Sequence, residues 1–216
     1  MVEEQTHMVE SQAGSRADPS ALGLAAFAVT TFLVSLYNVG ASMPLTAFFA
    51  IALFYGGMAE FVAGLFEYRR ENTFGATAYT SYGALYLAAA GVAWMLATGR
   101  ITEAALSPGL GWILLAYAVV NLGFLAQSFR VSKALGLVFL GIEVTEILLF
   151  IGYFAGETAG AGAVAIAGVI GILTSIVTCY AAWAALLNSA AGRDVLLVGR
   201  PHEAEQPDVH LGRRAA

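Results

Sequence analysis

Four glutamates lie inside long apolar stretches of the sequence: Glu60, Glu67, Glu143 and Glu146. A carboxylate at the centre of a membrane helix costs about 2.5–3.5 kcal/mol on insertion scales, so one that is kept there is a candidate for function. Glu143 and Glu146 are three residues apart and share a helix face, where two ionised carboxylates would repel each other. The pair predicts a proton-accepting site. The alternative is that each faces a different helix and bonds to a nearby hydroxyl group.

Glu60 and Glu67 differ in their sequence surroundings. Glu60 has Gly56 and Gly64 four residues away on either side, which places it on a small-residue face that must point into protein rather than lipid. We therefore interpret Glu60 as part of an internal pathway. Glu67 is followed within three residues by two arginines. This arrangement favours an ion pair or a helix-end role for Glu67 over contact with a substrate.

Uncharged polar residues also cluster in the apolar stretches, notably Thr30 and Asn38 in the first and Asn121 in the fourth. Some such groups only bridge helices, at roughly 0.6 kcal/mol each. Asn38, close to Gly40 and Pro44, predicts an irregular helix end that a solute can reach. The residues that we predict to line a substrate and proton pathway are Thr30, Asn38, Glu60, Glu143 and Glu146.

The elements that must position these residues are membrane helices. The chain has 216 residues, of which 59% are hydrophobic and only 12% charged, against roughly 45–50% apolar residues in ordinary soluble domains. Its mean hydropathy is +0.75. Six apolar runs are each long enough to span about 30 Å of hydrocarbon. They lie at 20–40, 44–66, 74–98, 109–128, 134–154 and 162–190.

These runs predict an all-α integral membrane protein with one transmembrane domain, residues 18–199. The acidic, polar segments 1–17 and 200–216 predict disordered tails. Six spans put both tails on one side, where nine of the ten basic residues also fall, leaving Arg100 alone on the other. Because positive residues concentrate on the cytoplasmic side, we expect a multi-pass protein of the cell membrane with both termini cytoplasmic.

Signals for catalysis or cofactor binding are missing from the sequence. It contains no Gly-x-Ser-x-Gly, no phosphate-binding Gly-x-x-x-x-Gly-Lys and no His-Glu-x-x-His motif. The three histidines all lie in the tails, and a single cysteine, Cys179, cannot form a disulfide within the chain. The net charge of −5 does not suggest nucleic acid as a partner. We therefore expect no enzyme, no cofactor and no metal site, with the lipid bilayer as the surrounding medium.

One long stretch, FYGGMAEFVAGLFEY at 54–68, is followed by NTFG at 72–75 and TSYG at 80–83. In these segments the chain closely resembles the acetate uptake transporter family, also called AceTr. Residues 18–24, DPSALGL, are similar to the family's Asn-Pro-x-Pro-Leu-Gly-Leu signature, and 188–198 is similar to its C-terminal segment. The resemblance covers about residues 18–199. The matched signature positions are Asp18, Pro19, Leu22 and Gly23.

The resemblance implies a six-helix protomer in a homohexamer, each protomer with its own pathway, moving acetate and sometimes succinate with protons. It also implies a constriction of the pathway at Phe27, Tyr82 and Ile142. An apolar constriction can reject hydrated ions by dewetting while a partly desolvated small acid passes. The implied function is membrane transport of acetate and related short monocarboxylates.

The chain departs from the family pattern at charged positions. Asp18 replaces the signature's Asn, Glu60 stands where the family usually has Gln, and Glu143 and Glu146 stand where neutral residues are expected. An acetate anion would avoid three ionised carboxylates, so these are protonated, or face away from the pathway, or serve a different substrate. Two alternatives therefore stay open: a channel for a neutral or cationic solute such as ammonia, an amide or urea, and a membrane sensor without transport.

Overall fold

The computed structural model describes residues 17–201 and is entirely helical apart from its connections. Six of its helical segments are long and apolar enough to cross a membrane, which confirms the predicted number of spans. In chain order they are α2 (Pro19–Asn38), a composite of α3 (Leu45–Ile51), η1 (Ala52–Ala59) and α4 (Glu60–Tyr68), α5 (Thr73–Ala97), α6 (Glu103–Val131), α7 (Lys133–Phe154) and α8 (Gly162–Ala191).

Polar side chains at helix N-termini set where several spans begin. Asp18, Asn72, Thr102 and Ser132 each precede a helix, and each accepts a hydrogen bond from a backbone N–H of its first turn. Such caps satisfy N–H groups that have no partner within the helix. Ser132 alone separates α6 from α7, in an extended conformation (φ −165°, ψ 157°), so these two helices form a tight antiparallel hairpin.

The second span contains a feature that the sequence did not predict. Its middle third, η1, is π-helical, with one residue more per hydrogen-bonded turn than an α-helix. Gly56 and Gly57 lie within it, and a Cβ on Gly57 would lie 2.6 Å from the Leu87 side chain of α5. The wider turn therefore lies where the backbone approaches its neighbours closely. Glu60 is the first α-helical residue after it.

The fourth span begins earlier than the sequence indicated. We expected a break from Gly99 to Gly109, but α6 starts at Glu103 and carries Pro108 inside its second turn. A proline near a helix N-terminus costs little, because the N–H groups there lack helical partners anyway. Thr102, whose side chain accepts from the N–H of Ala105 at 3.3 Å, provides the cap that allows this early start.

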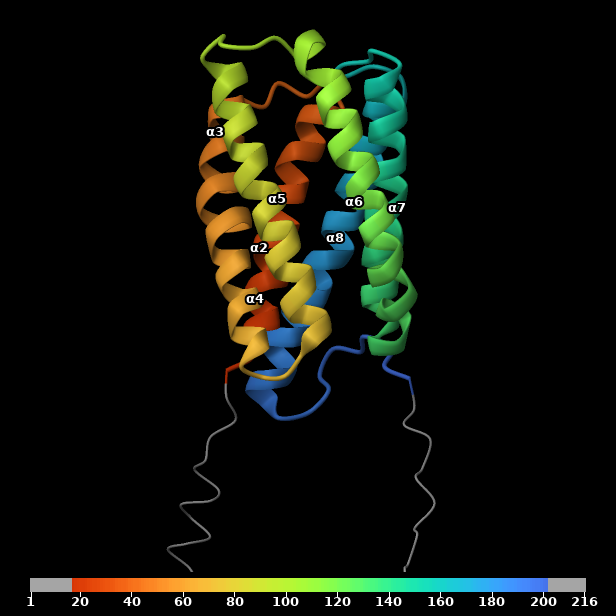
Figure 1. Cartoon of the computed structure of the whole chain (residues 1–216). Coiled ribbons are helices and arrows are strands. Elements are labelled where there is room, and N and C mark those ends of the chain that lie inside the picture. The colour runs from red at the N-terminus through yellow and green to blue at the C-terminus, as the bar shows by residue number, and fades with distance from the viewer. Residues whose placement is uncertain (1–16, 202–216) are drawn as a thin grey trace, which may run out of the picture.

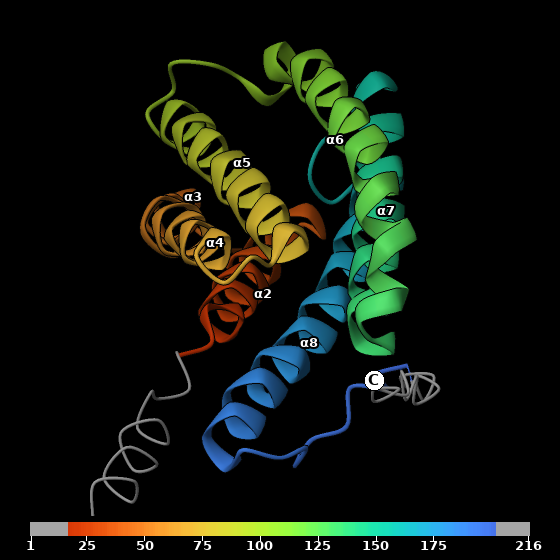
Figure 2. The same cartoon turned by 60° about the horizontal axis from the view of Figure 1, so that its bottom comes forward.

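The helices form a ring in which neighbours pack side by side (Figure 1). α2 packs along α8, α8 along α7, α7 along α6, and α4 along α5, whereas α5 and α6 touch least. Turning the bottom of the molecule forward shows these helices surrounding a common interior (Figure 2). Both described ends of the chain lie at one end of the bundle, which we call the terminal end (Figure 1). The opposite end is the distal end.

The segment after α8 folds back across the terminal end. Backbone N–H groups of Lys133 and Ala134 donate to the carbonyls of Gly199 and Val198, both at 3.0 Å. The predicted tails, 1–17 and 200–216, lie outside the described residues except for Ala17, Arg200 and Pro201.

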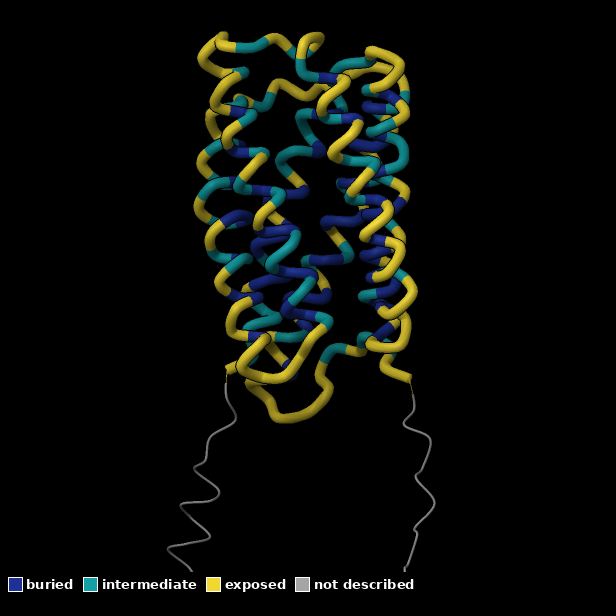
Figure 3. Tube along the Cα trace, in the orientation of Figure 1, coloured by how far each residue is buried: buried dark blue, intermediate teal, exposed yellow. Residues whose placement is uncertain are grey.

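Exposed positions of the spans lie mainly on the outer side of the ring (Figure 3), and many of them carry large apolar side chains. The most exposed of these include Phe54, Trp112 and Trp183, on three different spans. Buried positions lie on the inner sides of the helices and include polar residues of the spans, among them Glu60, Asn121 and Glu146. An apolar exterior with polar residues inside is the arrangement required of a multi-pass membrane protein.

Candidate functional site: a constricted pathway

Phe27, Tyr82 and Ile142 come together in the interior from α2, α5 and α7. They lie eight or nine residues after the first residues of their helices, Pro19, Thr73 and Lys133, and so at one level of the bundle. The rings of Phe27 and Tyr82 meet edge to face with centroids 5.4 Å apart. All three side chains are buried in one cluster. The structure thus assembles the three residues of the expected constriction.

These three residues lie between two cavities and line both. The cavity on the distal side has a volume of about 210 Å³ and is mostly apolar, with Asn38, Thr31 and Glu146 among its polar lining. The pocket on the terminal side is small, about 20 Å³, and is lined also by Glu60. We call them the distal cavity and the inner pocket. The side chains of Phe27, Tyr82 and Ile142 therefore separate one half of the interior from the other.

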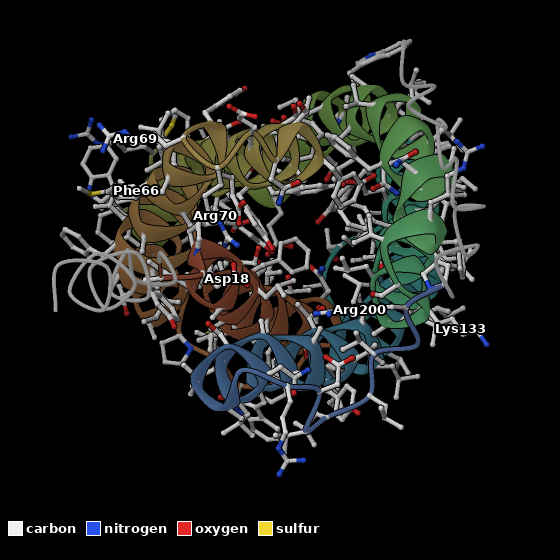
Figure 4. The ribbon with its side chains drawn as sticks, turned by 90° about the horizontal axis from the view of Figure 1, so that it is seen from below. Asp18, Phe66, Arg69, Arg70, Lys133 and Arg200 are labelled. Carbon is white, nitrogen blue, oxygen red and sulfur yellow. The ribbon has the colours of Figure 1, made fainter. Side chains whose placement is uncertain are left out.

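A larger cavity of about 440 Å³ opens at the terminal end. Seen from that end, Asp18, Arg70 and Arg200 lie toward the interior of the ring, whereas Phe66, Arg69 and Lys133 lie at its periphery (Figure 4). Asp18 caps α2 and forms an ion pair with Arg70. The terminal cavity therefore has a charged rim that the distal cavity lacks.

Glu67 has a structural role at this end. Its Oε2 accepts a hydrogen bond from Asn72 Nδ2 at 2.9 Å, and its Oε1 accepts from the Ser20 hydroxyl. The expected ion pair of Glu67 with a neighbouring arginine does not form among the described residues, because Arg70 binds Asp18 instead. Glu67 instead has the expected helix-end role, because it binds Asn72, which caps α5, and Ser20 in the first turn of α2.

The remaining signature residues build the start of α2. Pro19 occupies its first turn, where a missing N–H costs nothing. A Cβ on Gly23 would lie 2.8 Å from the ring of Tyr79, so the absence of a side chain lets α5 approach α2. Leu22 is exposed on the outer surface.

A hydrogen-bond network attaches polar groups to the constriction. Tyr82 Oη lies 2.9 Å from Asn121 Oδ1 and 3.2 Å from Glu146 Oε1. Asn121 Nδ2 donates to Glu143 Oε2 at 2.8 Å and to the Phe139 carbonyl at 3.1 Å. Glu143 bonds to Asn121 on α6 and Glu146 contacts the Tyr82 hydroxyl on α5, so the two carboxyl groups face different helices, as in the alternative interpretation, although both belong to one network. Glu146 lines the distal cavity, whereas Glu143 lines none of the described cavities.

Two other predicted pathway residues have different surroundings. Glu60 is buried beside the inner pocket, and its Oε2 has no hydrogen-bond partner among the described residues. Thr30 lines none of the described cavities: its hydroxyl donates to the Ala26 carbonyl at 2.9 Å, and its side chain contacts Gly56 of η1. The adjacent Thr31 faces the distal cavity instead.

Three residues near the constriction were not among the predicted pathway residues: Thr31, Tyr86 and Asn121. The hydroxyls of Thr31 and Tyr86 lie 2.5 Å apart on the wall of the distal cavity. A sequence signal for two of them exists, because Phe27, Tyr82 and Ile142 are each followed four residues later by a polar residue. These residues are Thr31, Tyr86 and Glu146. That spacing is one helical turn toward the distal end.

Comparison with known proteins agrees with this architecture. A model of the GPR1/FUN34/yaaH family matches residues 3–193. The chain is 37% identical over 186 residues to the succinate-acetate/proton symporter SatP of Escherichia coli K12, covering 86% of this chain and 97% of SatP. It is 33% identical over 177 residues to ammonia transport outward protein 2 of Saccharomyces cerevisiae, covering 79% of this chain and 61% of that protein.

A solved structure of the bacterial acetate channel SatP matches this fold with a TM-score of 0.77 at 36% identity, covering 86% of this chain and all of that one (100%). Six spans around an interior divided by a constriction define a membrane transporter or channel rather than an enzyme. The chain belongs to the GPR1/FUN34/yaaH family. The resemblance seen in the sequence motifs is thereby confirmed.

Proposed function

We propose that this chain moves acetate and related short monocarboxylates, with succinate as a further candidate, across the cell membrane together with protons. One observation carries the proposal. Phe27, Tyr82 and Ile142 lie between two cavities in a chain that is 37% identical to a succinate-acetate/proton symporter.

The geometry of the interior favours a small, weakly hydrated solute. The distal cavity, at about 210 Å³, is smaller than the roughly 300–1,000 Å³ of pockets that bind drug-sized ligands. The apolar and aromatic side chains of the constriction cannot replace the water molecules that a hydrated ion must lose, so ions are rejected. The free-energy cost of desolvation is lower for a short acid, because its methyl group gains apolar contacts on entering.

We propose that the terminal end faces the cytoplasm. Among the described residues, six basic side chains lie at that end and Arg100 lies at the other, a difference that favours a cytoplasmic location for the terminal end. The six are Arg69, Arg70, Arg130, Lys133, Arg193 and Arg200. An epitope fused to the C-terminus should be detectable only in permeabilised cells. Detection on intact cells would contradict this orientation.

We propose that the protomers assemble as a homohexamer, each with its own pathway, on the basis of the resemblance to the acetate uptake transporter family. Native mass spectrometry of the detergent-purified protein should give six times the mass of the 22.5 kDa chain. A monomer that retains transport would contradict it.

The transport proposal is tested with the purified protein in liposomes. Labelled acetate uptake is measured with an inward proton gradient and without one, against protein-free liposomes at matched pH, because acetic acid itself crosses bilayers. We expect saturable uptake that the gradient accelerates and that unlabelled acetate competes away. Uptake no faster than in protein-free liposomes would contradict the proposal.

The second candidate is a channel for ammonia or another small neutral or cationic solute, including an amide or urea. The observations that favour it are the buried carboxylates Glu60, Glu143 and Glu146 and the relative named as an ammonia transport outward protein. Labelled methylammonium uptake in the same liposomes separates the two candidates. Methylammonium flux without acetate flux would establish this alternative.

A further inference from the structure

The wall of the distal cavity directly beyond the constriction carries three polar residues at one level. Thr31, Tyr86 and Glu146 lie 12 or 13 residues after the first residues of α2, α5 and α7. At 1.5 Å per residue this is roughly 20 Å from the terminal end, near the middle of a bilayer. All three line the distal cavity. A solute that reaches the constriction from the distal side must pass them.

The hydrogen bonds around Tyr82 restrict where the protons of the network can lie. Both N–H groups of the Asn121 amide are donated, to the Phe139 carbonyl and to Glu143, so its Oδ1 can only accept. The single phenolic proton of Tyr82 goes to that oxygen, at 2.9 Å. The Tyr82 hydroxyl also lies 3.2 Å from Glu146 Oε1, and its one proton cannot serve both oxygens fully. Both contacts are satisfied at once if Glu146 is protonated and donates to Tyr82 Oη while Tyr82 donates to Asn121.

The other oxygen of Glu146 is a free acceptor. Glu146 is 96% buried (4% exposed), and its Oε2 has no hydrogen-bond partner among the described residues. A buried acceptor without a partner costs about 1–3 kcal/mol. A ligand that donates a hydrogen bond to Oε2 removes that cost.

The same wall also has a free donor. The hydroxyls of Thr31 and Tyr86 carry one proton each, and the hydrogen bond between them, 2.5 Å long, uses only one of the two. The second proton has no acceptor among the described residues. An unused donor and an unused acceptor therefore belong to residues of the same cavity lining at the same level. The Tyr37 hydroxyl, six residues further along α2 toward the distal end, is another group of this lining that has no partner among the described residues.

We propose that this pair of groups binds the carboxyl group of an undissociated short carboxylic acid. The acid's O–H donates to Glu146 Oε2, and its carbonyl oxygen accepts from the Thr31–Tyr86 hydroxyl pair. This inference rests on the proposed function and names the chemical form of its substrate. A carboxylate anion offers acceptors only and would meet the acceptor Oε2, while an ammonium ion offers donors only and leaves the hydroxyl proton unused.

The surrounding charges agree with a neutral ligand. The described titratable groups around Glu146 and in the lining of the two cavities are all tyrosines or glutamates. They are Tyr37 on α2, Tyr79, Tyr82 and Tyr86 on α5, Tyr117 on α6, Glu143 and Tyr153 on α7, and Glu60 at the inner pocket. α8 contributes Thr174. Among the described residues that line the distal cavity there is no lysine, arginine or histidine to balance an anion. The proton therefore crosses on the acid itself, and transport carries no net charge.

The test compares three variants in the acetate-uptake liposomes. Glu146→Leu removes the acceptor and should raise the KM for acetate about tenfold. Glu146→Gln supplies an acceptor oxygen and an N–H toward Tyr82, as the neutral acid does, and should recover most of that loss. Gln127→Leu, at an exposed position of α6 that lines none of the described cavities, is the matched control for a polar-to-leucine change. Size-exclusion chromatography confirms that each variant is folded.

Membrane potential gives a second readout that needs no variant. Uptake of the undissociated acid should be unaffected by a potassium diffusion potential of either sign and should follow the concentration of undissociated acid as pH changes. Uptake that responds to the potential would overturn the inference without contradicting acetate transport itself.

Two further outcomes test the chemical form of the substrate. A Glu146→Gln variant as impaired as Glu146→Leu would also overturn the inference, because Glu146 would then need to ionise. Acetamide, which offers a carbonyl acceptor and two N–H donors, should compete. Transport of acetamide without acetate would overturn the assignment to an acid.

Discussion

The constriction is built from residues whose partners are far away in the sequence. Phe27, Tyr82 and Ile142 were expected from the family resemblance, and Glu143 and Glu146 from their spacing on one helix. Asn121, which links them, was not selected, because its partners Tyr82 and Glu143 are 39 and 22 residues away. Hydrogen bonds between helices depend on how the helices rotate against each other, and one sequence does not determine that rotation.

At the residue scale, the Thr31–Tyr86 pair gives a prediction. The double change Thr31→Val and Tyr86→Phe removes both hydroxyls from the distal cavity and leaves the shapes of the side chains nearly unchanged. We expect the KM for acetate to rise about tenfold, because the acid's carbonyl oxygen loses its donor. Initial rates over a range of acetate concentrations provide the measurement.

Thr30→Val is the matched control for that double variant. Thr30 is adjacent to Thr31 but bonds within α2 and contacts Gly56 rather than a cavity. Its KM should remain within about twofold of the wild type. A rise in the KM of Thr30→Val equal to that of the double variant would show that the effect comes from helix packing.

At the element scale, the six spans follow directly from hydrophobicity, and the predicted ends of five of them lie within a few residues of the observed ends. The exception is the start of α6, where a break from Gly99 to Gly109 was expected but the Thr102 cap starts a helix at Glu103. The π-helical segment η1 was also missed. A π-turn needs close packing against neighbours to compensate for its poorer geometry, and that packing is a property of the assembled bundle.

Glycines in α5 test this packing. A Cβ on Gly83 would lie 2.7 Å from the backbone N of Phe61, whereas a Cβ on Gly91 would meet no atom within 4 Å. Gly83→Ala should therefore destabilise the protein by about 1–3 kcal/mol, since backbone cannot move aside as a flexible side chain can. Gly91→Ala, on the same helix, should be neutral or stabilising by up to about 1 kcal/mol. Thermal unfolding in detergent measures both; equal midpoints would refute the close approach of α4 and α5.

At the scale of the whole molecule, the described interior has three parts along one axis. A charged terminal cavity, the constriction with its inner pocket, and an apolar distal cavity follow one another. The family resemblance implied the constriction, and the residue pattern indicated the carboxylates near it. It did not indicate that the two sides differ in polarity, because the charged rim is formed by the turn after α4, the start of α2 and the segment after α8, which meet only in the folded chain.

The most direct test of the account is whether acids pass between Phe27, Tyr82 and Ile142. Ile142→Trp places a larger side chain in the constriction, and labelled acetate uptake is compared with the wild type in liposomes under an inward proton gradient. Size-exclusion chromatography first establishes that the variant is folded. We expect saturable uptake by the wild type and uptake by Ile142→Trp no faster than in protein-free liposomes. A folded Ile142→Trp protein that takes up acetate as fast as the wild type would contradict it.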